Sequence, residues 1–188
     1  MRVISGIAKG VSLFSPQGIK IRPTSDFVKE SLFNIIRDDV REAKFLDLFA
    51  GSGAIGIEAL SRGAAAVTFA DVSQKSVDLI KRNLEKTRLG AAAVVMKGDA
   101  LLMPKKLAGQ KFDIIFMDPP YFEGGFVEKV LGEICAGDIL EDSGYIILEM
   151  SKALTAPKVD GLKAFDEREY SGTRLVFMEK TSDKEGII

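Results

Sequence analysis

Apolar and polar positions follow two alternating periods along the chain from Lys44 onward. Short apolar runs typical of buried strands are followed by segments with an apolar residue every three or four positions, as in amphipathic helices. The predicted strands are 45–49, 66–70, 93–96, 112–117 and 144–150, and the predicted helices are 54–62, 74–88 and 126–134, with a short helix and loop over 101–111. Repeated strand–helix units indicate a parallel sheet with helices on both faces.

The two ends of the chain depart from this repeat. At the N-terminus, residues 2–7 and 11–14 alternate as two short strands with a turn at 8–10, and a further extended piece covers 19–22. A helix is expected after Pro23, capped by Thr24 or Ser25 and running to about Arg37. Near the C-terminus, 163–170 and 173–179 predict a hairpin that places an antiparallel strand at or near the sheet edge. The sequence therefore predicts three parts of the chain: an N-terminal hairpin extension (1–23), a main domain (24–180) and a flexible tail (181–188).

Composition narrows the class of protein. The 188 residues are 46% hydrophobic and 28% charged, which is ordinary for a soluble globular domain. No apolar run approaches the roughly 20 residues needed to span a bilayer, and the N-terminus lacks a signal-peptide pattern. The one cysteine, Cys135, excludes an internal disulfide. We therefore expect a cytoplasmic protein, and a monomer because no long exposed apolar stripe stands out.

The chain has no histidine. This excludes Ser-His-Asp and Cys-His nucleophilic catalysis and the usual zinc sites, and no metal site is predicted. Net charge is −1, yet residues 1–29 carry five basic side chains against one acid. That local excess fits either a phosphate-binding surface or a solvated hairpin, and charge alone does not decide between them.

The 112–117 strand leads directly into Asp118-Pro119-Pro120-Tyr121. Because proline has no N–H to donate, the chain must leave the sheet there as a rigid loop at its carboxyl edge, where open α/β sheets bind ligands. Asp118 and the free carbonyls are acceptors suited to an exocyclic amine, and Tyr121 offers a face for stacking a flipped base. The alternative is a simple strand-ending turn.

A glycine-rich loop follows the 45–49 strand. Gly51-Ser52-Gly53-Ala54-Ile55-Gly56 fits G-x-G-x-x-G between a strand and a helix, and Asp71 ends the next strand, where it can accept both ribose hydroxyls. This much suits a nicotinamide dinucleotide equally well. Asp47 before the loop can attract a cationic amino group, and Asp99 can accept from an adenine amine. Ribose, adenine and a zwitterionic tail together describe S-adenosylmethionine.

Several motifs carry a resemblance to a known family. The segments 45–53, 98–100 and 118–121 resemble the signatures of S-adenosylmethionine-dependent amino-methyltransferases. Arg22-Pro23-Thr24, Asp26 and 30–34 are similar to the N-terminal signature of the bacterial small-subunit ribosomal RNA guanine-N2 methyltransferases of the RsmD type. The resemblance covers essentially the whole chain. It implies a Rossmann-like class I methyltransferase fold, with a mostly parallel seven-stranded sheet, and transfer of a methyl group to guanine N2 in small-subunit RNA, possibly within a 30S particle.

Residue pattern and resemblance together predict three sets of site residues. The catalytic set is Asp118, Pro119, Pro120 and Tyr121; the cofactor-binding set is Asp47, Ala50, Gly51, Ser52, Gly53, Asp71, Val72, Asp99 and Ala100; the RNA-binding set is Lys9, Arg22, Thr24 and Lys29. Some positions depart from the family. Phe27 and Lys29 stand where arginines are common, and Asp71 stands where Glu is expected.

Three other functions fit part of the pattern. An adenine-N6 methyltransferase shares the Asp-Pro-Pro-Tyr loop, although so short a chain lacks a separate target-recognition domain. A nicotinamide-dependent oxidoreductase is favoured only by the glycine motif and Asp71, and it leaves Asp47, Asp99 and Asp118 unexplained. A non-catalytic RNA-binding or ribosome-assembly factor would not need an intact catalytic loop.

Overall fold

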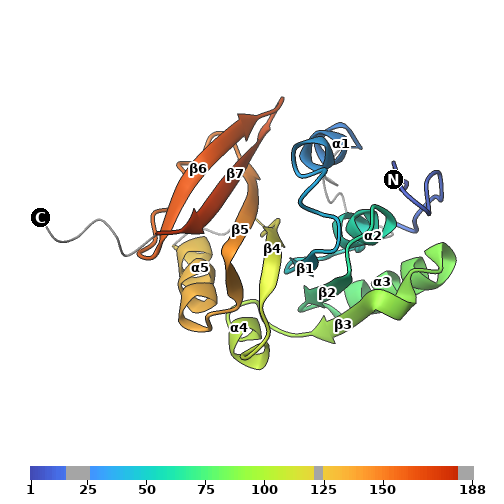
Figure 1. Ribbon diagram of the computed structural model, residues 1–188, viewed down its shortest axis with the longest axis horizontal. Coiled ribbons are helices and arrows are strands. Elements are labelled where there is room, and N and C mark those ends of the chain that lie inside the picture. Colours follow the sequence, from blue (N-terminus) through green and yellow to red (C-terminus); the bar gives the residue numbers. More distant parts are fainter. Residues whose placement is uncertain (16–25, 121–124, 182–188) are drawn as a thin grey trace, which may run out of the picture.

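A computed structural model describes residues 1–15, 26–120 and 125–181, and within these ranges one seven-stranded sheet has the order β3-β2-β1-β4-β5-β7-β6 (Figure 1). The strands are β1 Lys44–Asp47, β2 Ala66–Asp71, β3 Ala93–Lys97, β4 Phe112–Met117, β5 Leu140–Ser151, β6 Leu162–Glu169 and β7 Thr173–Lys180. The helices are α1 Asp26–Ile35, α2 Ala54–Ser61, α3 Gln74–Thr87, α4 Met103–Lys106 and α5 Phe126–Ala136, with a 3-10 turn, Gly90–Ala92. Strands β3, β2, β1, β4 and β5 are parallel, as predicted.

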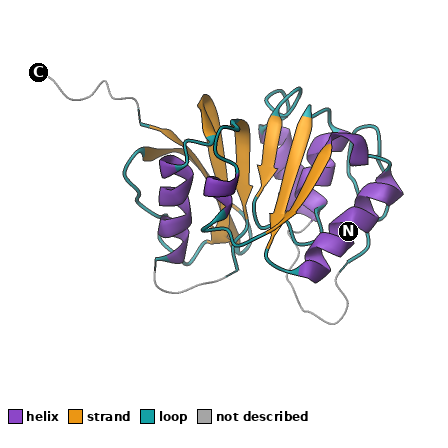
Figure 2. Cartoon of the chain, turned by 90° about the horizontal axis from the view of Figure 1, so that it is seen from below, coloured by secondary structure: helices purple, strands orange, loops and turns teal. Residues whose placement is uncertain are grey.

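Two apolar clusters hold the helices on opposite faces of the sheet (Figure 2). One face packs against α1, α2 and α3 through residues such as Leu32, Ile57 and Ile80. The other packs against α4 and α5 through residues such as Met103 and Leu131. The central strands are therefore buried on both faces, which is why they read as continuous apolar runs rather than as alternating ones.

The C-terminal hairpin extends the sheet as the sequence predicts. β7 pairs antiparallel with β5 and with β6, so β6 forms the outer edge. The burial of the two strands reflects this order: the middle of β7 (175–178) is buried, whereas β6 at the edge is mostly exposed. β5 begins at Leu140, four residues before the predicted strand, because Leu140 pairs with Phe112 ahead of an irregularity in the β4–β5 register.

The N-terminal segment differs from the predicted pair of strands. Residues 2–7 and 11–14 meet in one isolated bridge, Arg2 with Ser12, and residues 5–10 form bends and turns. The reason lies in helix α2. Backbone amides of Ile4 and Ser5 donate to the Glu58 carboxylate, and those of Ile7 and Ala8 donate to Ser61, so they do not form a ladder.

The same segment contributes to the main core. Val3, Ala8 and Leu13 are buried in the cluster that contains α1, α2 and α3. The predicted boundary at residues 23–24, the extended piece 19–22, the caps Thr24 and Ser25 and the tail from residue 182 lie outside the described residues.

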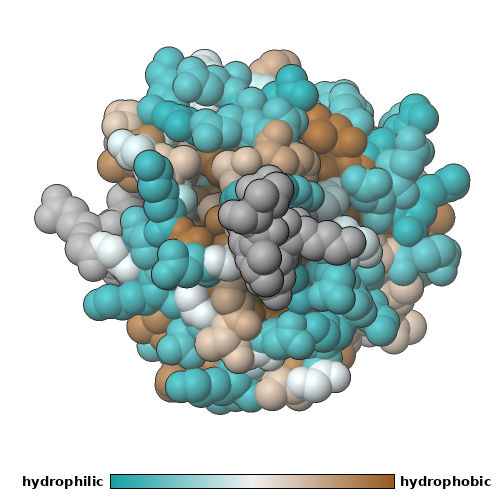
Figure 3. Space-filling view, turned by 60° about the vertical axis from the view of Figure 1, so that its left-hand side comes forward, coloured by the Kyte–Doolittle hydropathy of each residue, from teal (hydrophilic) through white to brown (hydrophobic). Residues whose placement is uncertain are grey.

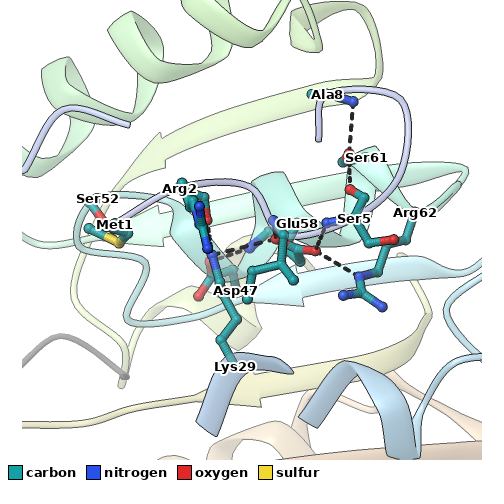
Figure 4. A network of polar contacts seen from close by, with 12 residues as sticks. Met1, Arg2, Ser5, Ala8, Lys29, Asp47, Ser52, Glu58, Ser61 and Arg62 are labelled. Carbon is teal, nitrogen blue, oxygen red and sulfur yellow. Dashed lines mark hydrogen bonds and ion pairs between the residues drawn. The ribbon is translucent and has the colours of Figure 1, made fainter. Parts of the chain in front are cut away.

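Glu58 is the centre of a buried polar network that joins this segment, α1 and α2 (Figure 4). The Glu58 side chain is fully buried, and it accepts from Arg62 Nε at 2.7 Å besides the two amides. Lys29 Nζ lies 3.4 Å from Glu58 and donates to the Arg2 carbonyl at 2.6 Å. Burial lowers the pKa of Lys29, an effect that the Glu58 charge opposes.

Asn83 of α3 makes a second connection from the N-terminal segment, this time to the glycine loop. Its side-chain oxygen accepts from the Phe14 amide at 2.8 Å. Its Nδ2 donates to the Phe14 carbonyl at 3.1 Å and to the Ser52 carbonyl at 2.9 Å. The fully buried amide therefore fixes the distance between residue 14 and the loop at 50–53.

The surface seen in Figure 3 is mainly hydrophilic, with apolar side chains in small groups between polar ones. Among the described residues, none of the helices combines the length and the apolar character needed to span a membrane.

We expect Glu58→Ala to lower the free energy of unfolding by about 3–5 kcal/mol, because it leaves Lys29 charged and buried without its carboxylate partner. Urea titration followed by circular dichroism measures this loss. Glu85→Ala, on the exposed side of α3, is the control and should change stability by less than about 0.5 kcal/mol. The double variant Lys29→Met with Glu58→Met should recover part of the loss. An equal loss in the double variant would contradict the unpaired-charge explanation.

Candidate functional site

Carboxylates line the carboxyl edge of the parallel strands. Asp47 ends β1 and Asp71 ends β2, while Asp118 directly follows β4 and Asp99 comes two residues after β3. Glu149 lies near the end of β5. Since the strand order is β3-β2-β1-β4-β5, these acids form a row along one edge of the sheet: Asp99, Asp71, Asp47, Asp118, Glu149.

Strand register places four of these acids on one face. Side chains two residues apart on a strand point to the same face. Asp47, Asp71, Asp118 and Glu149 each come two residues after a buried member of the cluster shared with α1, α2 and α3, namely Phe45, Phe69, Phe116 and Ile147. Strand pairing agrees with this placement. Asp47 pairs with Phe69 on one side and with Phe116 on the other, and Phe116 pairs with Ile147, so these residues lie side by side across the sheet.

The Asp71 carboxylate binds the backbone of the glycine loop. Its Oδ2 accepts from the Gly51 amide at 2.8 Å, and its Oδ1 accepts from the Ser73 amide at 2.8 Å. Gly51 and Gly53 have φ of 54° and 77°, a left-handed conformation that side chains disfavour. A carboxylate has about four acceptor positions, so Asp71 retains capacity for a ligand. The aspartate therefore has a role in shaping the loop that the sequence does not reveal.

Asp47 is buried, with 2% of its surface exposed, and its Oδ2 accepts from the Gly56 amide in the first turn of α2 at 3.0 Å. Burial raises the pKa of Asp47 to about 7, and the nearby Asp71 charge adds to the effect while the Gly56 bond opposes it. Gly56 has no room for a larger residue, because a Cβ there would lie 2.3 Å from the Phe69 ring. Asp47 thus joins the strand to the helix, which is compatible with its predicted ligand role.

The residues predicted to lie near the adenine are in the loops that follow β2 and β3. Val72 is 69% exposed directly after Asp71, and Asp99 is exposed with Oδ1 accepting from the Leu101 amide at 2.9 Å. Ala100 is buried. An exposed apolar side chain between two carboxylates fits an adenosine group, which combines a flat apolar base with polar edges and hydroxyls.

The side-chain position of Gly51 is open. A Cβ built on Gly51 would meet only the Phe49 carbonyl, at 4.0 Å. Backbone can therefore approach a bound molecule closely there, at the N-terminus of α2. The donor and acceptor set on this edge, with acids at Asp47 and Asp71, fits a ligand that has a cationic amino group and a ribose.

The loop after β4 begins with Asp118, whose pKa is raised further than that of Asp47. Burial raises the pKa of Asp118 to about 8, and the negative charges of Glu149 and then Asp47 add to it. Pro119 is half-buried and Pro120 is exposed. Tyr121, the fourth predicted catalytic residue, lies outside the described residues.

The predicted RNA-binding residues are not brought together. Lys9 is exposed on the N-terminal turn, whereas Arg22 and Thr24 lie outside the described residues. The prediction for Lys29 is wrong, because its side chain is 1% exposed and is held by Glu58 and the Arg2 carbonyl (Figure 4). A lysine was assumed to be solvated, but its long apolar stem allows burial where a carboxylate is available.

Sequence reasoning missed Glu149. It lies inside the predicted strand 144–150 rather than after it, yet only 7% of its surface is exposed. The available signal was an acid within an apolar run near the end of a strand, the same signal that identified Asp47.

Comparisons with known proteins find relatives along most of the chain. The family model described as "Conserved hypothetical protein 95" matches residues 1–179. The "Putative rRNA methyltransferase YlbH" of Bacillus subtilis is 40% identical over 96% of this chain and 98% of its own length. "Ribosomal RNA small subunit methyltransferase D" of Escherichia coli is 36% identical over 78% of this chain and 69% of its own. The solved structure of "Putative methyltransferase yhhF from Escherichia coli" superimposes with a TM-score of 0.85 at 30% identity, covering 96% of this chain and 97% of that one.

We expect the contribution of Asp118 to the stability of the ligand-free protein to fall as pH rises from about 4 to 8. With a raised pKa, folded Asp118 keeps a proton that the unfolded chain has lost in this range, so the unfolded state gains relative to the folded one with each increase in pH. Asp118→Asn removes this titration. At pH 8.5 the variant should therefore be more stable than the wild type by about 1–3 kcal/mol, with a much smaller difference at pH 5.

Urea titrations at pH 5, 6.5 and 8.5 measure the difference. Asp78→Asn, on the exposed side of α3, controls for the loss of one surface charge. A stability difference between Asp118→Asn and the wild type that does not change with pH would contradict the burial of an ionisable Asp118.

Proposed function

The chain belongs to the family described as Conserved hypothetical protein 95, which its match over residues 1–179 establishes, and on this premise we propose that it transfers a methyl group to the exocyclic N2 amine of a guanine in small-subunit ribosomal RNA. The coarser part of this assignment, an rRNA methyltransferase that uses S-adenosylmethionine, rests on relatives named for that activity at 34–40% identity. The choice of guanine N2 rests on the N-terminal signature and on the chemistry of the loop after β4.

The cofactor is assigned to the glycine loop and the flanking acids. Asp47 would attract the amino end of S-adenosylmethionine, the loop from Ala50 to Gly53 would accommodate its chain, and Asp71 would accept from the ribose. Val72, Asp99 and Ala100 would hold the adenine. When bound, the cofactor would supply an electrophilic methyl carbon on a sulfonium, which the acceptor nitrogen attacks while the thioether sulfur leaves.

Asp118 and the Pro119 carbonyl act on the acceptor amine. The lone pair of this nitrogen is delocalised into the purine ring, which makes it a poor nucleophile. Two acceptors that bind its two hydrogens favour a pyramidal nitrogen with an available lone pair. They also fix its direction of attack, and orientation of this kind contributes at most about 7–11 kcal/mol to lowering a barrier.

Positive charge develops on the nitrogen as it gains the methyl group. The Asp118 carboxylate stabilises that charge and then takes one of the two amine protons, which passes to solvent. Once ionised, a carboxyl with a pKa of about 8 is a stronger base than an ordinary aspartate carboxylate. The single observation that carries the proposal is therefore Asp118-Pro119-Pro120 at the end of a buried strand, in the same row of acids as the glycine-loop residues.

Several parts of the proposal concern the substrate. We place the RNA within an assembled or assembling small subunit, because a protein of net charge −1 with a small basic N-terminal excess benefits from additional contacts. Lys9, Arg22 and Thr24 are the proposed RNA-contacting residues. We also propose that the enzyme acts as a monomer in the cytoplasm. An adenine-N6 methyltransferase is the second candidate, favoured by the same Asp-Pro-Pro-Tyr sequence.

Incubation with methyl-labelled S-adenosylmethionine tests the acceptor. The substrates are unmodified small subunits and naked small-subunit RNA, each digested to nucleosides after reaction. We expect label in N2-methylguanosine, and a higher yield from the particle than from naked RNA. Label in N6-methyladenosine would replace guanine N2 with the second candidate, and label in neither nucleoside would overturn both.

Substitution at Asp118 tests its role. Asp118→Asn retains an acceptor oxygen, so we expect partial activity, whereas Asp118→Ala should lower turnover by about 10²–10³-fold. Both variants should bind the cofactor with wild-type affinity in calorimetry. An equal loss of cofactor affinity in Asp118→Ala would show that Asp118 belongs to the cofactor site instead.

A further inference from the structure

The aromatic ring of Phe14 lies against two basic side chains of helix α3. The guanidinium carbon of Arg82 is 4.6 Å from the ring centre, and Lys86 Nζ is 4.3 Å from it. Both distances are within the roughly 6 Å over which an aromatic face attracts a cation. The Phe14 side chain is 39% exposed and both basic residues are exposed, so these three residues, called the Phe14 cluster below, lie on the surface.

The buried Asn83 side chain fixes the position of Phe14. Its oxygen accepts from the Phe14 amide at 2.8 Å, and its Nδ2 donates to the Phe14 carbonyl at 3.1 Å. The same Nδ2 donates to the Ser52 carbonyl, so the Phe14 cluster adjoins the glycine loop. Helix α3 covers the face of the sheet to which the strand register assigns Asp118 (Figure 1). An RNA whose target base reaches Asp118 can therefore extend along this side of the molecule.

The two cations of the Phe14 cluster repel each other. Arg82 and Lys86 are four residues apart on a helix, a spacing at which like charges destabilise it. The acids of α3 are Asp78 and Glu85, and within the described part of the chain neither forms an ion pair with these cations. Asp78 instead accepts from Gln74 Nε2 at 2.9 Å. Two exposed cations beside one ring, without a carboxylate partner in those ranges, are suited to an anionic ligand.

The charge of the surrounding surface has the same sign. Residues 74–88 carry five basic side chains against two acids, and residues 1–15 carry two basic side chains and no acid, in a chain of net charge −1. These two stretches lie next to each other, because Phe14 is bonded to Asn83 of α3. The substrate of an rRNA methyltransferase carries a negative charge on every nucleotide. The local excess of positive charge is therefore complementary to the RNA backbone.

We propose that Arg82 and Lys86, held against Phe14, bind backbone phosphates of the RNA substrate. The ring holds both side chains in place, which reduces the conformational entropy that they lose on binding. Contacts of this kind position the RNA without reading its sequence. The inference rests on the part of the proposed function that names ribosomal RNA as the substrate, and it is independent of which base is methylated.

The competing explanation is that the Phe14 cluster only secures the N-terminal segment to α3. Lys86 is in the last turn of α3, where a cation also interacts favourably with the helix dipole. A purely structural contact predicts that its loss lowers stability and leaves the salt dependence of RNA binding unchanged. A phosphate contact predicts a weaker salt dependence when it is lost, because each neutralised phosphate releases counterions.

Equilibrium binding of unmodified small subunits at several salt concentrations provides the test. The dissociation constant is measured between about 50 and 200 mM KCl at constant Mg²⁺, with S-adenosylhomocysteine present. Arg82→Gln, Lys86→Gln and the double variant are compared with the wild type. The matched control is the double variant Lys81→Gln with Arg88→Gln. It also removes one lysine and one arginine from this part of the chain, but on the side that lines a groove with Val95 of β3.

We expect each single variant to lower the slope of log affinity against log salt by about 0.7–0.9, and the double variant to weaken binding about tenfold or more at about 0.1 M salt. Phe14→Leu retains both charges but not the ring that holds them, so it should weaken binding by less than the double variant. Turnover at saturating subunits should stay at the wild-type value, because neither cation touches the reacting atoms. Calorimetric binding of S-adenosylhomocysteine at wild-type affinity verifies that each variant is folded.

A wild-type salt slope in the double variant of Arg82 and Lys86 would overturn the inference. An equal decrease in the Lys81 and Arg88 control would also overturn it, because general charge would then explain the binding. If the double variant does not fold, the two single variants decide by the same criteria.

Failure of the proposed function has a different signature. Label in N6-methyladenosine of small-subunit RNA would reject guanine N2 and leave the phosphate contacts standing. A wild-type enzyme that neither binds nor methylates small subunits would reject ribosomal RNA as the substrate, and the inference with it.

Discussion

Parallel pairing of β3, β2, β1, β4 and β5 is the constraint on which the rest of the structure depends. Because all these strands run in one direction, their carboxyl ends meet at a single edge, and residues far apart in sequence become neighbours there. The strands are buried on both faces, so an acid near their ends is partly removed from water. The raised pKa values of Asp47 and Asp118 follow from this placement.

A second buried interaction joins the elements that cover one face of the sheet. The Glu58 carboxylate binds the N-terminal segment, Lys29 of α1 and Arg62 of α2, and so joins three parts of the chain on one face of the sheet. The amides of Ile4, Ser5, Ile7 and Ala8 donate to Glu58 and Ser61 of α2, whereas Met1 and Val3 form backbone hydrogen bonds with residues 10–13 of the same segment. A segment that is too short to fold alone is thereby ordered by a helix of the main domain.

Much of the fold could be predicted from the sequence, because periodicity reports burial directly. The central strands, the helices between them and the C-terminal hairpin all have strong patterns, and Asp118 was identifiable because two prolines must end its strand. The burial of Lys29 and Glu149 could not be predicted, because a charged residue is assumed to be exposed unless its partners are known. Likewise, two alternating segments predicted a hairpin at the N-terminus, but the amides of Ile4 and Ser5 donate to Glu58, more than 50 positions away.

Asn83 has a further consequence. One buried amide holds both Phe14, which lies in the sequence between Lys9 and Arg22 of the proposed RNA-contacting residues, and Ser52 of the glycine loop. A displacement of the N-terminal segment by RNA would reach the loop through this side chain, and a displacement of the loop would reach the segment. The two binding events would then be thermodynamically linked, and by reciprocity each would change the affinity of the other by the same factor. The affinities of the enzyme for its two substrates would in that case be coupled through one asparagine side chain.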